Sequence, residues 1–251
     1  MSKMFGAAFC IAILAGATGA AAAERPTIPA SAMKLDGVSI QAIYDGKRME
    51  FENYSYPKPL TGQVWYDFAK KKAMWGTYVF DGKENGLFRG KIRVKGDLFC
   101  YKEGKEKEIC VSVHLDGSNL YEADAKNVVI SVDTIVAAAP PALPESAKKA
   151  TPGEAMTAIG GKPVTVVIYD LPEPTIADLK WDAAKKRVTG KFIYGATKDG
   201  KVDGKISVAG EQVCVTNKGE KKANCHDIYL DAGGFYEVTA DGKMHAMSTY
   251  Q

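Results

Sequence analysis

Cysteine is the residue of this 251-residue sequence whose spacing can be tested most directly against known chemistry. Cys10 lies in an apolar leader, and the other four cysteines are Cys100, Cys110, Cys214 and Cys225. Zinc sites usually contain Cys-x2–4-Cys units, and the intervals here are longer. An even set of cysteines in an oxidising compartment is typical of disulfides. We therefore predict disulfides and no metal site at these residues.

The remaining reactive residue types form no motif with catalytic spacing. His114, His226 and His245 do not match one another between the two halves of the chain, and His226 simply follows Cys225. The sequence contains no Gly-x-Ser-x-Gly, His-Glu-x-x-His or phosphate-binding loop. Paired carboxylates can lie far apart in a sequence, and nothing selects a pair here. We assign no catalytic residue and expect neither a metal nor a cofactor.

An aromatic stretch is the one candidate binding segment. Arg48, Tyr54 and Tyr56 lie within residues 48–59, and Trp65 and Tyr66 follow shortly after. The Ile-Tyr-Asp tripeptide at 43–45 recurs at 168–170, and the first copy is longer from there to Asp67 than the second is to Asp182, so we interpret residues 48–59 as a surface insertion. Arginine and aromatic rings on such a loop predict a stacking platform for a glycan or a hot spot for a protein partner. The alternative is that the segment folds back and caps the domain.

An internal repeat organises the chain. Gly-Lys-Ile-x-Val-x-Gly at 90–96 recurs at 204–210, and Asp-x-Ala-Lys-Lys at 67–71 recurs at 182–186. Identities that keep one order indicate duplication of a single domain.

Each copy carries its own pair of cysteines on successive predicted strands, joined by a turn rich in Lys, Glu and Gly. Three pairings of four cysteines are possible, and duplication favours the local pairs Cys100–Cys110 and Cys214–Cys225. Closing so short a loop, of about 11 residues, contributes roughly 3 kcal/mol in the chain-entropy model.

Short stretches rich in β-branched and aromatic residues alternate with turn signals such as Asp81-Gly82 and Asn85-Gly86. Dipeptides of this type supply the positive φ of tight hairpins. We predict an all-β fold, with two tandem duplicated small antiparallel β-sandwich or β-barrel domains. The stretches expected to be strands in the first copy are residues 38–44, 63–66, 77–80, 91–94, 98–101, 109–114 and 128–132.

The ends and the middle of the chain set the expected domain boundaries. Residues 1–23 have a positive start, an apolar core and an Ala-x-Ala site, which predicts a signal peptide and a periplasmic or secreted protein. No segment is apolar for the roughly 20 residues that a membrane helix needs. The first β domain is expected at 32–134, a Pro/Ala-rich linker at 135–153 and the second β domain at 154–251. The formal charge of +3 is too small to predict nucleic-acid binding.

The run from Gly90 to Tyr101, followed by Cys110, resembles a pattern found in small secreted proteins of rhizobia and related alphaproteobacteria, a domain family of unknown function. The pattern is Gly, a charged residue, Trp, a hydrophobic strand, Gly-Asp, Leu-Cys and a second Cys. Ile92 and Ile206 stand at its Trp position. The resemblance implies an alphaproteobacterial periplasmic protein and carries no active site with it.

These observations favour a non-catalytic exported protein that binds a ligand or partner, such as an envelope glycan or an envelope protein. The alternatives are a secreted protease inhibitor, because small disulfide-bonded barrels can plug protease clefts, and a hydrolase with dispersed carboxylates. Neither the ligand nor the oligomeric state follows from the sequence.

Overall fold

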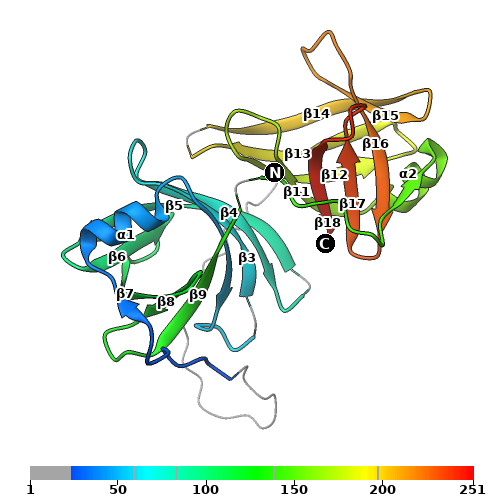
Figure 1. Ribbon diagram of the computed structural model, residues 1–251. Coiled ribbons are helices and arrows are strands. Elements are labelled where there is room, and N and C mark those ends of the chain that lie inside the picture. The colour runs from blue at the N-terminus through cyan, green and yellow to red at the C-terminus, as the bar shows by residue number, and fades with distance from the viewer. Residues whose placement is uncertain (1–23, 59, 83, 138, 197) are drawn as a thin grey trace.

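Two closed eight-stranded antiparallel barrels follow one another along the chain in the computed structural model (Figure 1), which describes residues 24–58, 60–82, 84–137, 139–196 and 198–251. Consecutive strands are neighbours throughout each barrel, and the last strand pairs with the first. The predicted all-β tandem fold is therefore confirmed, with barrels as the architecture. The signal-peptide prediction falls on residues 1–23, outside the described residues.

The two barrels are built from the same elements in the same order. The first comprises β1 (Met33–Lys34), α1 (Gly37–Tyr44), β2 (Arg48–Asn53), β3 (Leu60–Asp67), β4 (Ala73–Phe80), β5 (Glu84–Lys95), β6 (Leu98–Glu103), β7 (Ile109–Asp116), β8 (Asn119–Ala123) and β9 (Val129–Val136). The second comprises β10 (Lys148–Ala150), α2 (Pro152–Ile159), β11 (Pro163–Ile168), β12 (Thr175–Asp182), β13 (Arg187–Tyr194), β14 (Lys198–Ala209), β15 (Gln212–Asn217), β16 (Asn224–Asp231), β17 (Gly234–Val238) and β18 (Met244–Tyr250). The barrels proper are β2–β9 and β11–β18, while β1 and β10 add a short pairing to β7 and β16.

The linker expected at 135–153 overlaps elements of both barrels. Strand β9 continues to Val136, and both β10 and the start of α2 lie within that range. Among the described residues, no helix is both long enough and apolar enough to cross a bilayer.

The two disulfides are the predicted ones. Cys100 is bonded to Cys110 and Cys214 to Cys225. Each pair joins directly opposite residues of neighbouring strands, β6 with β7 and β15 with β16. Each barrel therefore contains its own disulfide, as expected for duplicated domains that fold independently.

The predicted strand at 38–44 is wrong, because these residues form helix α1. The Asp36 side chain caps the helix by accepting a hydrogen bond from the Ser39 backbone N–H at 2.8 Å. Ile40 and Tyr44 then enter the first core and are fully buried. Tertiary burial thus outweighs the strand preference of the β-branched and aromatic residues in this stretch.

The predicted turn at Asn85-Gly86 is also wrong, because both residues lie within β5. Asp81 and Gly82 have φ values of 54° and 65°, so they supply the positive φ values that the β4–β5 hairpin needs. With the chain already reversed there, the next Asn-Gly pair continues the strand.

The insertion inferred at residues 48–59 does not exist. Strand β2 corresponds to β11 and β3 to β12, and their connections, residues 54–59 and 169–174, have the same length. The Ile-Tyr-Asp tripeptides suggested the longer first copy, but 43–45 ends α1 whereas 168–170 ends β11. Local sequence identity between non-equivalent elements produced the wrong alignment.

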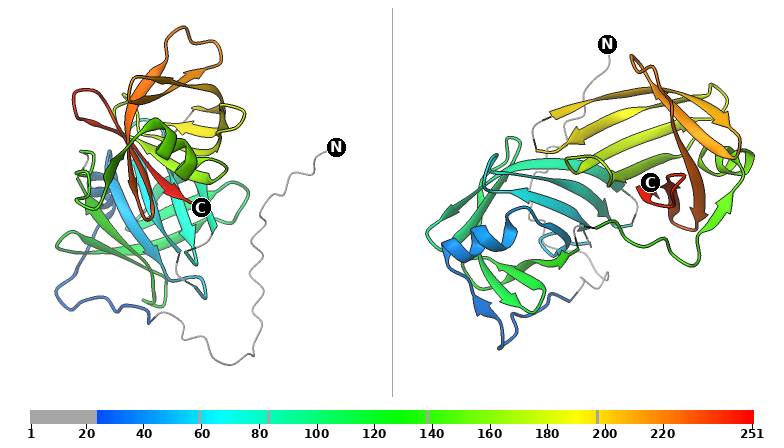
Figure 2. Two further views of the ribbon diagram at one scale, coloured as in Figure 1. Left: turned by 90° about the vertical axis from the view of Figure 1, so that its right-hand side faces the viewer. Right: turned by 45° about the horizontal axis from the view of Figure 1, so that its top comes forward.

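The barrels lie side by side in Figure 1 and in the right view of Figure 2, and they share a buried apolar cluster. Trp65 and Trp75 of the first barrel form one buried apolar cluster with Val167, Ile176 and Ile193 of the second. At the edge of this cluster, the indole Nε1 of Trp75 donates to the carbonyl oxygen of Pro174 at 3.3 Å. This contact therefore fixes the position of one barrel relative to the other. Residues of both barrels can then contribute to one binding surface.

Candidate functional site

The five candidate binding residues do not form a common loop surface. Tyr66 lies inside the first barrel and donates a hydrogen bond to Asp133 at 2.9 Å. Trp65 belongs to the apolar cluster between the barrels. Arg48 is buried, and its guanidinium carbon lies 5.5 Å from the ring centre of Tyr169 in the second barrel. Three of the five candidates therefore hold the protein together.

Tyr54 and Tyr56, the other two candidates, are half-buried. The ring of Tyr56 meets Phe80 edge-on at 6.0 Å. Tyr54 lines a groove between the barrels, and burial together with a hydrogen bond to Glu52 raises its pKa to about 12. Tyr54 is therefore a neutral hydroxyl at every physiological pH.

This groove between the barrels has a volume of about 450 Å³. Its walls come from β2, β3, β4, β5 and β9 of the first barrel and from β11 and β18 of the second. The Asn85 amide nitrogen donates to the carbonyl oxygen of Tyr250 at 3.2 Å and so connects the two walls. A volume of this size suits a small ligand or a short segment of a polymer.

Hydroxyl groups dominate the polar lining of the groove. They come from both barrels and belong to Thr61, Thr77, Thr134, Thr165, Thr249, Tyr54 and Tyr78. Hydroxyls both donate and accept hydrogen bonds, and the tyrosine rings add apolar faces beside them. Such a lining fits a ligand that is itself rich in hydroxyls.

Gln63 is one of the groove-lining residues and carries a polar atom that none of the described residues pairs with. Its Oε1 is buried and has no hydrogen-bond partner among the described residues. A buried acceptor left unpaired costs about 1–3 kcal/mol, and rotation of the Gln63 amide toward the groove would let a ligand donor recover it.

The charge of the groove restricts the ligand further. Glu50 and Glu52 are among the lining residues, and within the part of the chain that the structure describes no lysine or arginine lines the groove. A neutral or cationic ligand therefore fits better than an anionic one, because an anion would meet two carboxylates and no compensating side chain.

A second polar cluster is a pair of adjacent acids inside the core of the first barrel, and it is buried away from solvent. Glu122 and Asp133 are 3% and 2% exposed. Tyr44 donates to Glu122 at 2.9 Å, and Ser131 donates to Asp133 at 2.8 Å. Because aromatic rings and strands surround the pair, a substrate has no route to it, and we regard it as part of the core.

The sequence held little signal for the groove. Thr61 of β3, Thr165 of β11 and Thr249 of β18 are ordinary strand residues until a second barrel faces them. The one available clue was the pair of outward tryptophans, Trp65 and Trp75, because large rings on a polar face indicate an interface. That pattern indicates a contact surface but does not say what the surface contacts.

Comparison with known proteins gives no assignment. No protein-family model and no curated protein matches the chain. A structure of a protein of unknown function of the DUF3598 family from Nostoc punctiforme is 11% identical, covers 83% of this chain and 95% of its own, and has a TM-score of 0.19. A DNA polymerase sliding clamp from Pseudomonas aeruginosa is 8% identical, with 88% of this chain and 64% of the clamp covered and a TM-score of 0.15. Similarities this low carry no argument about function.

Proposed function

We propose that this protein is an exported, non-catalytic binding protein that holds a neutral or amino-bearing glycan segment in the groove between its barrels. The unpaired Gln63 Oε1 in a groove lined by hydroxyls carries the proposal. Sugar hydroxyls would donate to Gln63, exchange hydrogen bonds with the threonines, and place C–H faces on the tyrosine rings. The leader at residues 1–23 and the two disulfides support a periplasmic or secreted location.

Titration calorimetry with chitotetraose and maltotetraose as neutral probes, and tetragalacturonate as an anionic one, tests this function. We expect a neutral tetrasaccharide to bind and the anionic one to bind at least tenfold more weakly. The Gln63→Leu variant should lose about tenfold in affinity, because one hydrogen bond of about 1.4 kcal/mol is removed. Tyr54→Ala should weaken binding further by removing a ring face.

The matched control is Gln41→Leu, which makes the same exchange on the exposed side of α1. It should leave affinity unchanged. Absence of binding by both neutral probes, preference for tetragalacturonate, or equal affinities of the two glutamine variants would each contradict the proposal.

A further inference from the structure

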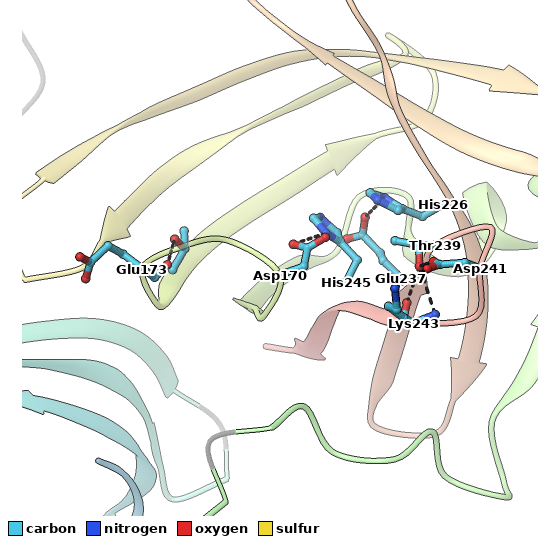
Figure 3. A network of polar contacts seen from close by, with 9 residues as sticks. Asp170, Glu173, His226, Glu237, Thr239, Asp241, Lys243 and His245 are labelled. Atoms are coloured by element: carbon cyan, nitrogen blue, oxygen red, sulfur yellow. Dashed lines mark hydrogen bonds and ion pairs between the residues drawn. The ribbon is translucent and has the colours of Figure 1, made fainter. Parts of the chain in front are cut away.

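The second barrel contains a cluster of histidines and carboxylates that is separate from the groove (Figure 3). His226 of β16, Glu237 of β17 and His245 of β18 each offer a ligand atom, and these atoms lie within 4.8 Å of one another. Asp170, directly after β11, places Oδ1 2.7 Å from Nδ1 of His245.

A β-bulge brings His245 into this cluster. Glu237 pairs with Ala246 and Val238 with Met244, so His245 is the extra residue on its strand. A bulge interrupts the strict alternation of side chains and turns an additional one toward the same face. The ring of His245 consequently stacks on that of His226, with centres 3.9 Å apart and planes at 15°.

The first barrel shows that the fold does not need these histidines. Val111 follows Cys110 as His226 follows Cys225, and the equivalent bulge of β9 holds Ile130 where β18 has His245. Only the acid, Glu122, is kept at the position of Glu237. The first barrel thus has apolar residues at these two positions, and the second barrel has histidines there.

We propose that His226, Glu237 and His245 form a binding site for a divalent transition-metal ion of the zinc class. Nδ1 of His226 and Oε2 of Glu237 are 3.2 Å apart, close to the roughly 3.4 Å between two ligands of a tetrahedral zinc ion. Imidazole and carboxylate are ligands that zinc accepts, and three protein ligands leave one position open.

Asp170 has the place of an orienting carboxylate beside the metal ligands. By lying next to Nδ1 of His245 it leaves Nε2 as the ligand atom, an arrangement common behind metal-bound histidines. His245 Nδ1 is buried and, despite this proximity, makes no aligned hydrogen bond with the described residues. Side-chain exposure rises from 10% at His226 and 12% at Glu237 to 41% at Asp170, which provides an entry path.

The alternative is a metal-free cluster in which each histidine simply pairs with one carboxylate. Titration calorimetry of the protein with Zn²⁺ distinguishes the two, and Co²⁺ absorption in the visible range reports the ligand geometry. We expect one Zn²⁺ per chain and an intense Co²⁺ spectrum typical of four-coordination. The His226→Val and His245→Ile variants carry the residues of the first barrel, so they should fold and should bind Zn²⁺ at least 100-fold more weakly.

Two further variants sharpen the test. Asp170→Asn should weaken Zn²⁺ binding by 10- to 100-fold, as expected when an orienting partner of a ligand is lost. His114→Gln replaces the remaining histidine of the chain, on β7 of the first barrel, and should leave Zn²⁺ affinity unchanged. Zinc binding that is undetectable in the unaltered protein, that survives in the His226→Val/His245→Ile variant, or that falls equally in His114→Gln would overturn the proposal. None of these results depends on saccharide binding in the groove.

Discussion

At the scale of single residues, the most consequential group is the acid pair inside the first barrel. Burial raises the pKa of Asp133 to about 6, and burial together with the charge of Asp133 raises the pKa of Glu122 well above its ordinary value. Because both folded pKa values exceed those of the unfolded chain, the native state holds these protons more tightly. The contribution of this pair to the free energy of unfolding is therefore fully present below about pH 4 and is lost as the pH rises.

For Asp133 the loss runs from about pH 4 to about pH 6 and amounts to something on the order of 3 kcal/mol. For Glu122 the loss begins near the ordinary pKa of a glutamate and extends well above it, because burial raises the pKa of this carboxyl in the folded protein. The Glu122→Gln variant keeps an acceptor for Tyr44 and cannot ionise. We expect it to match the unaltered protein at pH 4 and to exceed its free energy of unfolding by an amount that grows toward pH 8.

Urea unfolding at pH 4, 6 and 8 measures this difference. Glu145→Gln makes the same exchange at an exposed position between the barrels, and it should not show this growth. A pH-independent difference for Glu122→Gln as well would show that the buried pair does not titrate as described.

At the scale of elements, the two helices are short, and their ends determine whether they form. Thr151 caps α2 by accepting from the Glu154 backbone N–H at 3.3 Å, while the Glu154 carboxylate accepts from the Thr151 N–H at 2.8 Å. This capping box satisfies backbone donors that the helix itself leaves unpaired. The fully buried Ala155 and Ile159 depend on it to reach the second core.

Thr151→Ala should therefore lower the free energy of unfolding by about 1 kcal/mol. Thr157→Ala, an exposed exchange of the same type within α2, should be neutral or slightly stabilising because alanine is the better helix former. Thermal melts of both variants, followed by circular dichroism, give the comparison. Equal losses in the two would mean that the cap contributes nothing beyond the threonine side chain itself.

The elements also show what a sequence of this kind can predict. Hairpins and local disulfides depend on residues close together in the chain, so the turn at Asp81-Gly82 and the bond between Cys100 and Cys110 could be predicted. Helix α1 could not be assigned from eight residues without a clear helical period, although its cap, Asp36, was a visible signal. The bulge that places His245 beside His226 depends on register between distant strands, which the sequence does not reveal.

At the scale of the whole molecule, the contact between the barrels creates the groove and could not be foreseen from either copy alone. Trp65 was expected to contribute to ligand binding because it follows the aromatic stretch at residues 48–59, and it instead meets the second barrel. Duplication supplied two similar barrels, and their outer faces have since become different. The groove is therefore a property of the pair, which implies that it should vanish when the barrels separate.

Ile176→Asp places a charge in the contact between the barrels, where the side chain is fully buried against Trp65 and Trp75 and is not part of either barrel core. Burying an unpaired carboxylate is costly, so the barrels should separate while each stays folded. We expect a larger radius of gyration by small-angle X-ray scattering, together with loss of chitotetraose or maltotetraose binding. Val208→Asp, at an exposed position of β14, should change neither property. If Ile176→Asp kept both the compact shape and the affinity, the groove would not depend on this contact.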